Sequence, residues 1–89
     1  SNVLVGDNIT CTVLLFAKAA EVFGKRETQL TLPVQSTGND LFGLLSEQVP
    51  EFAQLKCTCA IAVNKTLCSF ETPIEDKAVV AILPPVSGG

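Results

Sequence analysis

Short apolar stretches separated by polar turns dominate the first third of the chain. Residues 10–16 (TCTVLLF) are rich in β-branched and large apolar residues, which predicts a buried strand. Residues 17–23 change to good helix formers and are followed by Gly24, so we expect one or two helical turns that end at this glycine. Apolar and polar residues alternate over 27–32 and stop at Pro33, which predicts a second strand paired back to the first.

A helical pattern follows in the middle of the chain. Four apolar residues of the segment 40–49 recur at the spacing of one helix face: Leu41, Leu44, Leu45 and Val49. Either Thr37 or Asn39 is suited to cap this helix, and Pro50 ends it. Gly43 weakens the helix by about 1 kcal/mol relative to alanine, so packing must hold it in place.

Three further strands are expected in the second half of the chain. Residues 59–63 and 66–70 flank Asn64-Lys65, and because asparagine tolerates a positive φ, this pair predicts a two-residue hairpin turn. Residues 79–83 (VVAIL) predict the last strand. The order strand, strand, helix, strand, strand, strand predicts an α+β domain in which one main helix lies across a mixed sheet of about five strands.

Strand parity predicts that both faces of this sheet are apolar. A two-residue turn pairs Ile61 with Cys68 and Ala62 with Leu67, so alternate residues of each strand share a face. One helix covers one face, and we assign the bulkier set to the core. The other face would expose three large apolar side chains separated by small alanines: Phe16, Leu67 and Leu83. Such a flat apolar face favours a partner site, although scattered apolar residues are also common on protein surfaces.

Composition and charge exclude several classes of function. The 89 residues are 47% hydrophobic and 17% charged, which predicts one ordered domain. A net charge of −3 disfavours binding to nucleic acid, and no apolar run is long enough to span a membrane. The chain contains no histidine, so neither a Ser-His-Asp triad nor a Cys-His pair can form within it. We therefore do not expect a self-contained active site.

The four cysteines are expected to be free thiols in a reducing, cytosolic compartment, because the apolar content is high enough to fold without disulfides. Cys11, Cys59 and Cys68 are interpreted as small buried hydrophobic residues. Cys57 and Cys59 form a Cys-x-Cys pair, for which a persulfide role is the alternative. Zinc binding is not expected without histidine or a second close pair.

The last six residues, 84–89 (PPVSGG), follow the final strand directly. Two prolines fix φ and remove backbone donors, so we expect an extended arm that reaches roughly 20 Å at ~3.3 Å per residue. Gly88 and Gly89 carry no side chains, which would let the terminal carboxylate enter a narrow channel. That carboxylate is ionised near pH 7, so it reacts only after another protein gives it a leaving group, most simply an acyl-adenylate formed with ATP. The alternative is a disordered terminus.

Three stretches of the sequence resemble a known family: residues 14–18 with Gly24 following, residues 62–70, and residues 80–89. They are similar to the β-grasp, ubiquitin-like sulfur carriers, and in particular to the small subunits of molybdopterin synthase. The similarity extends from about Thr10 to Gly89. It implies an N-terminal extension over residues 1–9, a β-grasp domain over 10–83, and an extended tail over 84–89.

The resemblance implies a cycle of activation and sulfur transfer. A ubiquitin-activating-like adenylyltransferase would adenylate Gly89 with ATP, and sulfur transfer would convert this residue to a thiocarboxylate (1-thioglycine). The thiocarboxylate would donate sulfur to cyclic pyranopterin monophosphate and so form the dithiolene of molybdopterin. The resemblance implies no permanently bound cofactor and no metal.

The resemblance also implies a large catalytic subunit as partner, in a heterotetramer of two small and two large subunits. Phe16, Leu67 and Leu83 match the hydrophobic docking positions of the family. The tail would thread into the pocket of the large subunit, with Gly88 and Gly89 at its tip and the remaining contacts made by Pro84, Pro85, Val86 and Ser87.

Two alternatives share the fold and the tail. One is a ubiquitin-like protein modifier conjugated to lysines through Gly89, and the other is a sulfur carrier for a different pathway such as thiamin synthesis. Stable lysine conjugates would favour the first, and the identity of the large partner that co-purifies distinguishes the second. A purely structural binding module would tolerate extra residues after Gly89.

Overall fold

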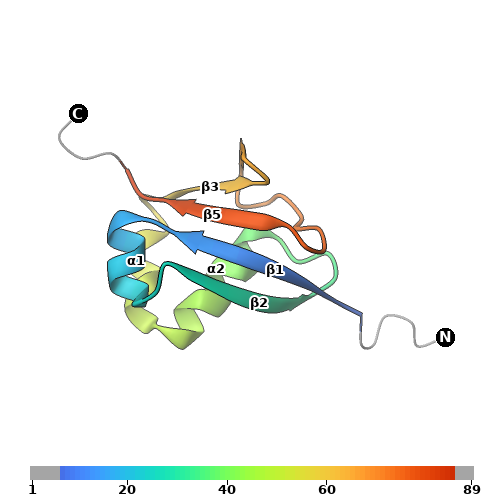
Figure 1. Ribbon diagram of the computed structural model, residues 1–89, viewed down its shortest axis with the longest axis horizontal. Helices are drawn as coiled ribbons and strands as arrows, with labels where there is room; N and C mark the ends of the chain where they lie inside the picture. The colour runs from blue at the N-terminus through green and yellow to red at the C-terminus, as the bar shows by residue number, and fades with distance from the viewer. Residues whose placement is uncertain (1–6, 86–89) are drawn as a thin grey trace.

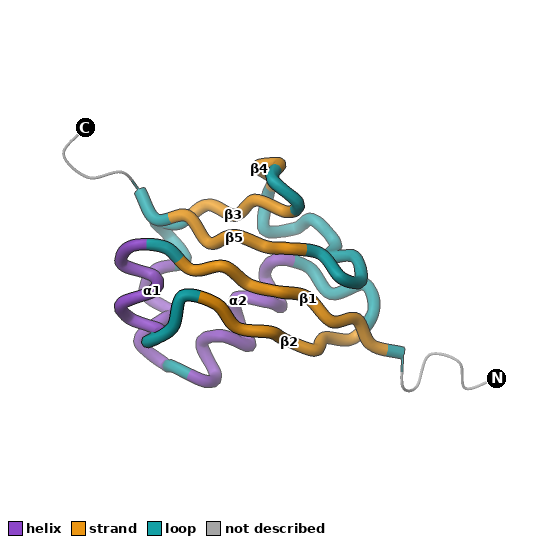
Figure 2. The backbone as a smooth tube through the Cα atoms, in the orientation of Figure 1, coloured by secondary structure: helices purple, strands orange, loops and turns teal. Residues whose placement is uncertain are grey.

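A computed structural model describes residues 7–85, which form a five-stranded sheet with helices on one side (Figures 1 and 2). The elements follow one another as β1 (Asn8–Leu15), α1 (Ala17–Phe23), β2 (Glu27–Pro33), α2 (Gly38–Gln48), the 3₁₀ helix η1 (Pro50–Leu55), β3 (Ala60–Val63), β4 (Thr66–Cys68) and β5 (Val79–Leu83).

The sheet is mixed, with the strand order β2-β1-β5-β3-β4. The first and last strands, β1 and β5, are parallel neighbours at its centre, and the other pairs are antiparallel. Ile61 lies opposite Cys68, and Ala62 lies opposite Leu67. The predicted α+β class, mixed sheet and hairpin register are therefore confirmed.

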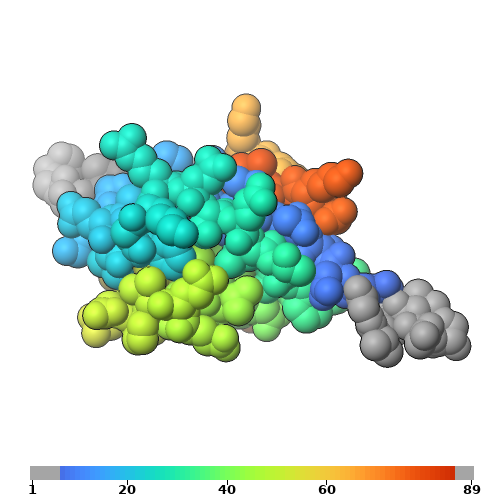
Figure 3. Space-filling view, turned by 60° about the horizontal axis from the view of Figure 1, so that its bottom comes forward, coloured from blue at the N-terminus to red at the C-terminus, as the bar shows by residue number. Residues whose placement is uncertain are grey.

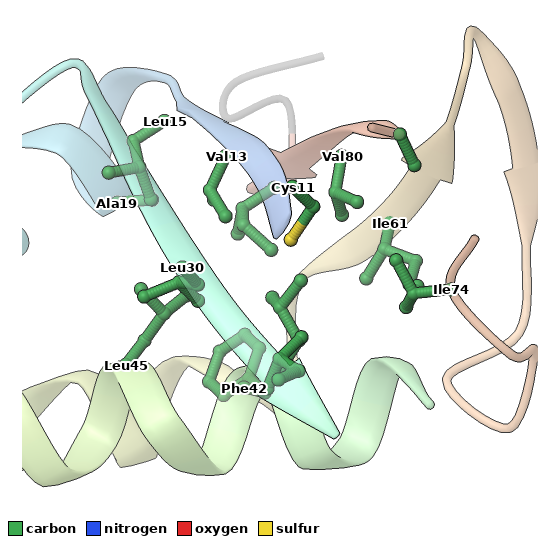
Figure 4. Packing of buried hydrophobic residues seen from close by; sticks show 14 of the residues in the cluster. Cys11, Val13, Leu15, Ala19, Leu30, Phe42, Leu45, Ile61, Ile74 and Val80 are labelled. Carbon is green, nitrogen blue, oxygen red and sulfur yellow. The ribbon is translucent and has the colours of Figure 1, made fainter. Parts of the chain in front are cut away.

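The core fills the space between the sheet and the helices (Figure 4). Alternate residues of β1 point into the core, and buried residues of α2 and η1 pack against them. The most deeply buried side chains include Cys11, Val13, Leu41, Phe42, Leu45, Phe52, Ile61, Val80 and Ile82. The Phe42 and Phe52 rings pack at 4.8 Å between centroids, and Phe23 and Phe70 each lie 5.7 Å from a member of this pair. Four of the five phenylalanines thus form one cluster.

The N-terminus of α2 is fixed by local and long-range hydrogen bonds. Thr37 is the capping residue: its Oγ1 accepts from the Asp40 N–H (3.4 Å), and the Asp40 carboxylate accepts from the Thr37 N–H (2.8 Å). The Asn39 N–H donates to the Phe70 carbonyl (2.8 Å). Gly38 lies close to this loop: a Cβ here would lie 3.1 Å from both Cα and the carbonyl oxygen of Phe70 and 2.6 Å from a methyl carbon of Ile61, so any larger residue would require these neighbours to shift. These contacts join α2 to the loop after β4.

Two strand boundaries differ from the sequence expectation by two residues, and three others differ by one: β1 ends at Leu15, β2 at Pro33, and β3 begins at Ala60. β1 begins at Asn8 rather than Thr10, because Ile9 pairs with Leu32 and is buried in the core. β4 ends at Cys68 rather than at residue 70, because the Phe70 carbonyl bonds to α2 and its ring packs against Phe42 instead of continuing the strand.

The helical segments also differ from the expectation. α2 covers residues 38–48 rather than 40–49. A 3₁₀ helix, η1, follows where only a short connection was expected; Pro50 occupies its first turn, and Phe52 anchors it in the core.

Gly43, in the middle of α2, has no role inside the fold. A Cβ at this position would meet nothing within 4 Å, and the residue is exposed. Glycine costs a helix about 1 kcal/mol relative to alanine. Packing between residues 7–85 therefore does not explain this glycine.

Candidate functional site

The face of the sheet opposite the helices is uncovered within residues 7–85 (Figure 2). Strand pairing brings Leu67, Ala62, Ala81 and Leu14 into one row across β4, β3, β5 and β1. Together with their neighbours of the same parity they form an apolar surface, here named the open face: Leu14, Phe16, Ala62, Leu67, Val79, Ala81 and Leu83.

A hollow of about 450 Å³ lies in the open face. It forms where Ala62 and Ala81, which have small side chains, lie side by side between larger residues. Lys65 is the charged member of a lining that is otherwise mainly apolar: Leu14, Phe16, Ala62, Asn64, Lys65, Val79, Ala81 and Leu83. The hollow can receive an apolar side chain of another molecule, with an acidic group beside it.

The three residues singled out from the sequence lie on this face in different environments. Phe16 is 46% exposed and lines the hollow, whereas Leu67 is 68% exposed and lies outside it on the edge strand β4. Leu83 is half-buried. Sequence reasoning did not single out Leu14 or Val79 as contact residues, although their strand parity already placed them on the same face as Phe16 and Leu83.

Phe16 is the one phenylalanine outside the aromatic cluster. Its backbone caps α1, since its carbonyl accepts from the N–H groups of Ala19 (3.0 Å) and Ala20 (3.4 Å). The next residue, Ala17, has a left-handed φ of 51°, a conformation that costs roughly 1–2 kcal/mol for a residue with a Cβ. This turn takes the chain directly from β1 into α1 and leaves the Phe16 side chain on the open face.

The β3–β4 turn is fixed to β5 at the rim of the hollow. Asn64 and Lys65 have φ of 50° and 74°, which confirms the predicted hairpin turn. The Asn64 N–H donates to the Val79 carbonyl (2.8 Å), and the Val79 N–H donates to Asn64 Oδ1 (2.9 Å). This pair of hydrogen bonds holds the backbone of Lys65 beside the apolar lining.

The C-terminal segment leaves the sheet next to the open face. Pro84 is half-buried and Pro85 is exposed, directly after Leu83 at the end of β5. Because β5 is parallel to β1, the C-terminal end of β5 lies at the same end of the sheet as Phe16, which follows β1 (Figure 1). The predicted roles of Val86, Ser87, Gly88 and Gly89 fall outside the described residues and remain predictions.

The four cysteines all lie within the described residues and are free thiols. Cys11 and Cys59 are buried, as predicted, and burial raises the pKa of both thiols above the ordinary value. Cys68 is half-buried rather than buried as predicted, because it lies on the edge strand β4 and packs against the core from there, while Cys57 is exposed. Among residues 7–85 there is no group of three or more metal-ligating side chains placed to hold a metal ion.

We expect a maleimide at pH 7.5 to label Cys57 within minutes and to leave Cys11 and Cys59 unlabelled until the protein unfolds. Burial excludes the reagent from these two thiols, and a raised pKa lowers their thiolate fraction at this pH. Peptide mass spectrometry before and after addition of denaturant measures this order. Labelling of Cys11 in the folded protein at the rate of Cys57 would contradict the burial of this part of β1.

None of the helices in the described part of the chain has the length and apolar character needed to cross a membrane.

The sequence of this chain is similar to a known protein family and to curated proteins. The ThiS family model matches residues 13–89. The molybdopterin synthase sulfur carrier subunit of Dictyostelium discoideum is 36% identical over 80 residues, which cover 86% of this chain and 93% of that protein.

Two solved structures share the fold. Small archaeal modifier protein 1 of H. volcanii superposes with a TM-score of 0.80 at 20% identity, covering 88% of this chain and 99% of its own. One chain of the complex of subunits 1 and 2 of the molybdopterin-converting factor of Helicobacter pylori 26695 superposes with a TM-score of 0.67 at 26% identity, covering 91% of this chain and all (100%) of its own. The likeness to the archaeal modifier concerns the fold alone. The predicted ubiquitin-like β-grasp fold is confirmed.

Proposed function

Because the chain belongs to the ThiS family, we propose that it is the sulfur-carrier subunit of a molybdopterin synthase and acts in the biosynthesis of the molybdenum cofactor. The Dictyostelium relative, which carries that name and aligns over nearly its whole length, supports this assignment. The protein contributes the sulfur donor of a two-protein sulfurtransferase rather than an active site of its own.

The chemistry proposed for Gly89 has three steps. An activating adenylyltransferase joins the Gly89 carboxylate to AMP and releases pyrophosphate from ATP. Hydrosulfide then displaces AMP and leaves a thiocarboxylate. The thiocarboxylate sulfur attacks a side-chain carbon of cyclic pyranopterin monophosphate and displaces an oxygen substituent from it. Water then hydrolyses the resulting thioester, which leaves the sulfur on the pterin and returns the Gly89 carboxylate, so two carriers supply the two sulfurs of the dithiolene. ATP is consumed by the activating enzyme, and no cofactor stays bound to the carrier.

The observation that carries the proposal is the position of the open face beside the origin of the tail. An apolar hollow lies next to the end of β5, where Pro84 and Pro85 leave the sheet. A partner bound to the hollow would therefore hold the first residues of the tail, and the remaining residues 86–89 would reach into its pocket. The chain contains no histidine, so we assign the acid and base groups of the transfer to that partner.

We propose the large catalytic subunit as this partner, in a heterotetramer of two small and two large subunits in the cytosol. The Helicobacter pylori complex of subunits 1 and 2, one chain of which is 26% identical to this protein, supports a two-subunit assembly. Phe16, Leu67, Leu83, Pro84 and Pro85 would contact the large subunit, as would Val86 and Ser87 of the tail.

Reconstitution from purified components tests the proposal. The full chain is incubated with the activating enzyme, ATP and a sulfur donor, and intact-mass spectrometry follows the exchange of one oxygen for one sulfur. The thiocarboxylated protein is then mixed with the large subunit and cyclic pyranopterin monophosphate. We expect molybdopterin in proportion to the thiocarboxylate supplied, and none from the unmodified carboxylate. Formation of lysine conjugates without any pterin product would support the modifier alternative instead.

A further inference from the structure

The outer edge of β2 is a second surface with unused binding groups. The hydrogen bonds at the two ends of the β1–β2 pair show which residues of β2 face β1. The Leu15 N–H donates to the Arg26 carbonyl (2.8 Å), and the Val34 N–H donates to the Asp7 carbonyl (3.3 Å). Because backbone groups alternate in direction along a strand, the even-numbered residues of β2 turn theirs toward β1. The backbone N–H and C=O groups of the odd-numbered residues of β2 therefore point to the free edge of the sheet, away from β1: Glu27, Gln29 and Thr31. No strand of residues 7–85 pairs with this edge, and Pro33, which has no N–H, ends it.

A groove of about 610 Å³ runs between this edge and α2. One wall is the end of β2 and the turn after it, over residues 31–36, and the other is the exposed side of α2. Figure 3 brings this side of the molecule forward and shows the teal residues of β2 next to the yellow-green residues of α2. None of the lining residues belongs to the hollow in the open face.

Gly43 lies in the wall of this groove. Unlike Gly38, Gly43 has no neighbour within 4 Å of the position that a Cβ would take, so no contact within the described fold calls for a glycine that weakens α2. A glycine leaves the helix backbone uncovered, so an extended chain in the groove can approach α2 more closely here than at any residue with a side chain.

The charged side chains that line the groove are both acidic. Asp40 and Glu47 contribute carboxylates, and neither takes part in an ion pair within the described residues, where the salt bridge is Lys18–Glu21. The net charge of −3 would oppose the approach of a second copy of this chain. A basic occupant complements this groove.

We propose that the groove between β2 and α2 binds an extended, basic segment of a partner protein, which adds a sixth strand to the sheet. The outward backbone groups of Gln29 and Thr31 pair with the backbone of that segment, and its lysine or arginine side chains contact Asp40 and Glu47. Because β2 lies at the edge of the sheet farthest from β4, this segment and a partner on the open face can bind at the same time.

The full chain, labelled with ¹⁵N and titrated with two capped synthetic peptides, tests this proposal by NMR. One peptide alternates lysine with valine, and the other alternates glutamate with valine. With the lysine peptide we expect saturable amide shifts at Gln29, Thr31 and residues 39–47. The glutamate peptide should bind at least about tenfold more weakly, and added salt should weaken the lysine peptide.

Two variants of one residue separate binding from folding. Gly43→Gln fills the groove and should weaken the lysine peptide by about tenfold or more. Gly43→Ala should raise the melting temperature, because alanine favours the helix, and yet lower the affinity. Ala81→Gln, in the hollow of the open face, is the control and should leave the affinity unchanged.

The proposal is overturned by any of four results: shifts confined to the open face, equal binding of both peptides, no shifts at millimolar lysine peptide, or unchanged affinity in Gly43→Gln.

Discussion

Addition of one alanine after Gly89 is expected to lower the rate of sulfur transfer by more than about a thousandfold. The extra residue moves the reacting carboxylate by ~3.3 Å and adds a methyl group at the tip of the tail. Misplacement of a reacting group by about 1 Å already costs roughly a hundredfold. Pterin formation from single-turnover mixtures with the large subunit measures the loss.

Two further measurements accompany this variant. Its melting temperature should equal that of the parent chain, because Gly89 lies six residues beyond the last residue of β5, Leu83. Its affinity for the large subunit should change little, since the open face is intact. Full activity of the extended chain would exclude a carboxylate at Gly89 as the reacting group and would favour a structural binding module.

Phe16→Asp is expected to weaken binding of the large subunit by about a hundredfold, which corresponds to about 2.7 kcal/mol. The substitution removes a 46% exposed aromatic side chain from the hollow and puts a carboxylate in its place. Folding should survive, because Phe16 is the N-cap of α1 with no side-chain capping bond, and aspartate is a preferred residue there. Isothermal titration calorimetry gives the affinity.

Val34→Asp is the matched control for this prediction. Val34 is 40% exposed, much as Phe16 is, but it lies after β2 and away from the open face. We expect its affinity for the large subunit to stay within about twofold of the parent chain. Equal losses in both variants would mean that exposed apolar area in general, rather than the open face, governs binding.

The features that the sequence predicts well are those set by local patterns. Apolar spacing predicts α2, and an asparagine that tolerates positive φ predicts the turn at Asn64. Strand parity then identifies the uncovered face, since a two-residue turn fixes which side chains share it. The candidate contact residues Phe16 and Leu67 follow from this register, without any knowledge of the tertiary structure.

The features that the sequence does not predict depend on contacts between distant segments. Phe70 reads as part of a strand, but its carbonyl bonds to Asn39 and its ring packs on Phe42, and these contacts end β4 earlier. η1 has no clear periodicity and is held by the burial of Phe52. The groove beside Gly43 exists only after α2 packs next to β2. The role of Gly89 rests on family resemblance.

The central pairing of β1 with β5 has a consequence for folding of the protein during its synthesis on the ribosome. Among the strands of residues 7–85 these are the first and the last to be synthesised, and together they form the middle of the sheet. Contacts between such distant segments form late and require the whole chain. A product that ends before β5 therefore presents neither Ala81 in the hollow nor a correctly placed Pro84, so a partner that recognises both would bind only chains that extend past β5.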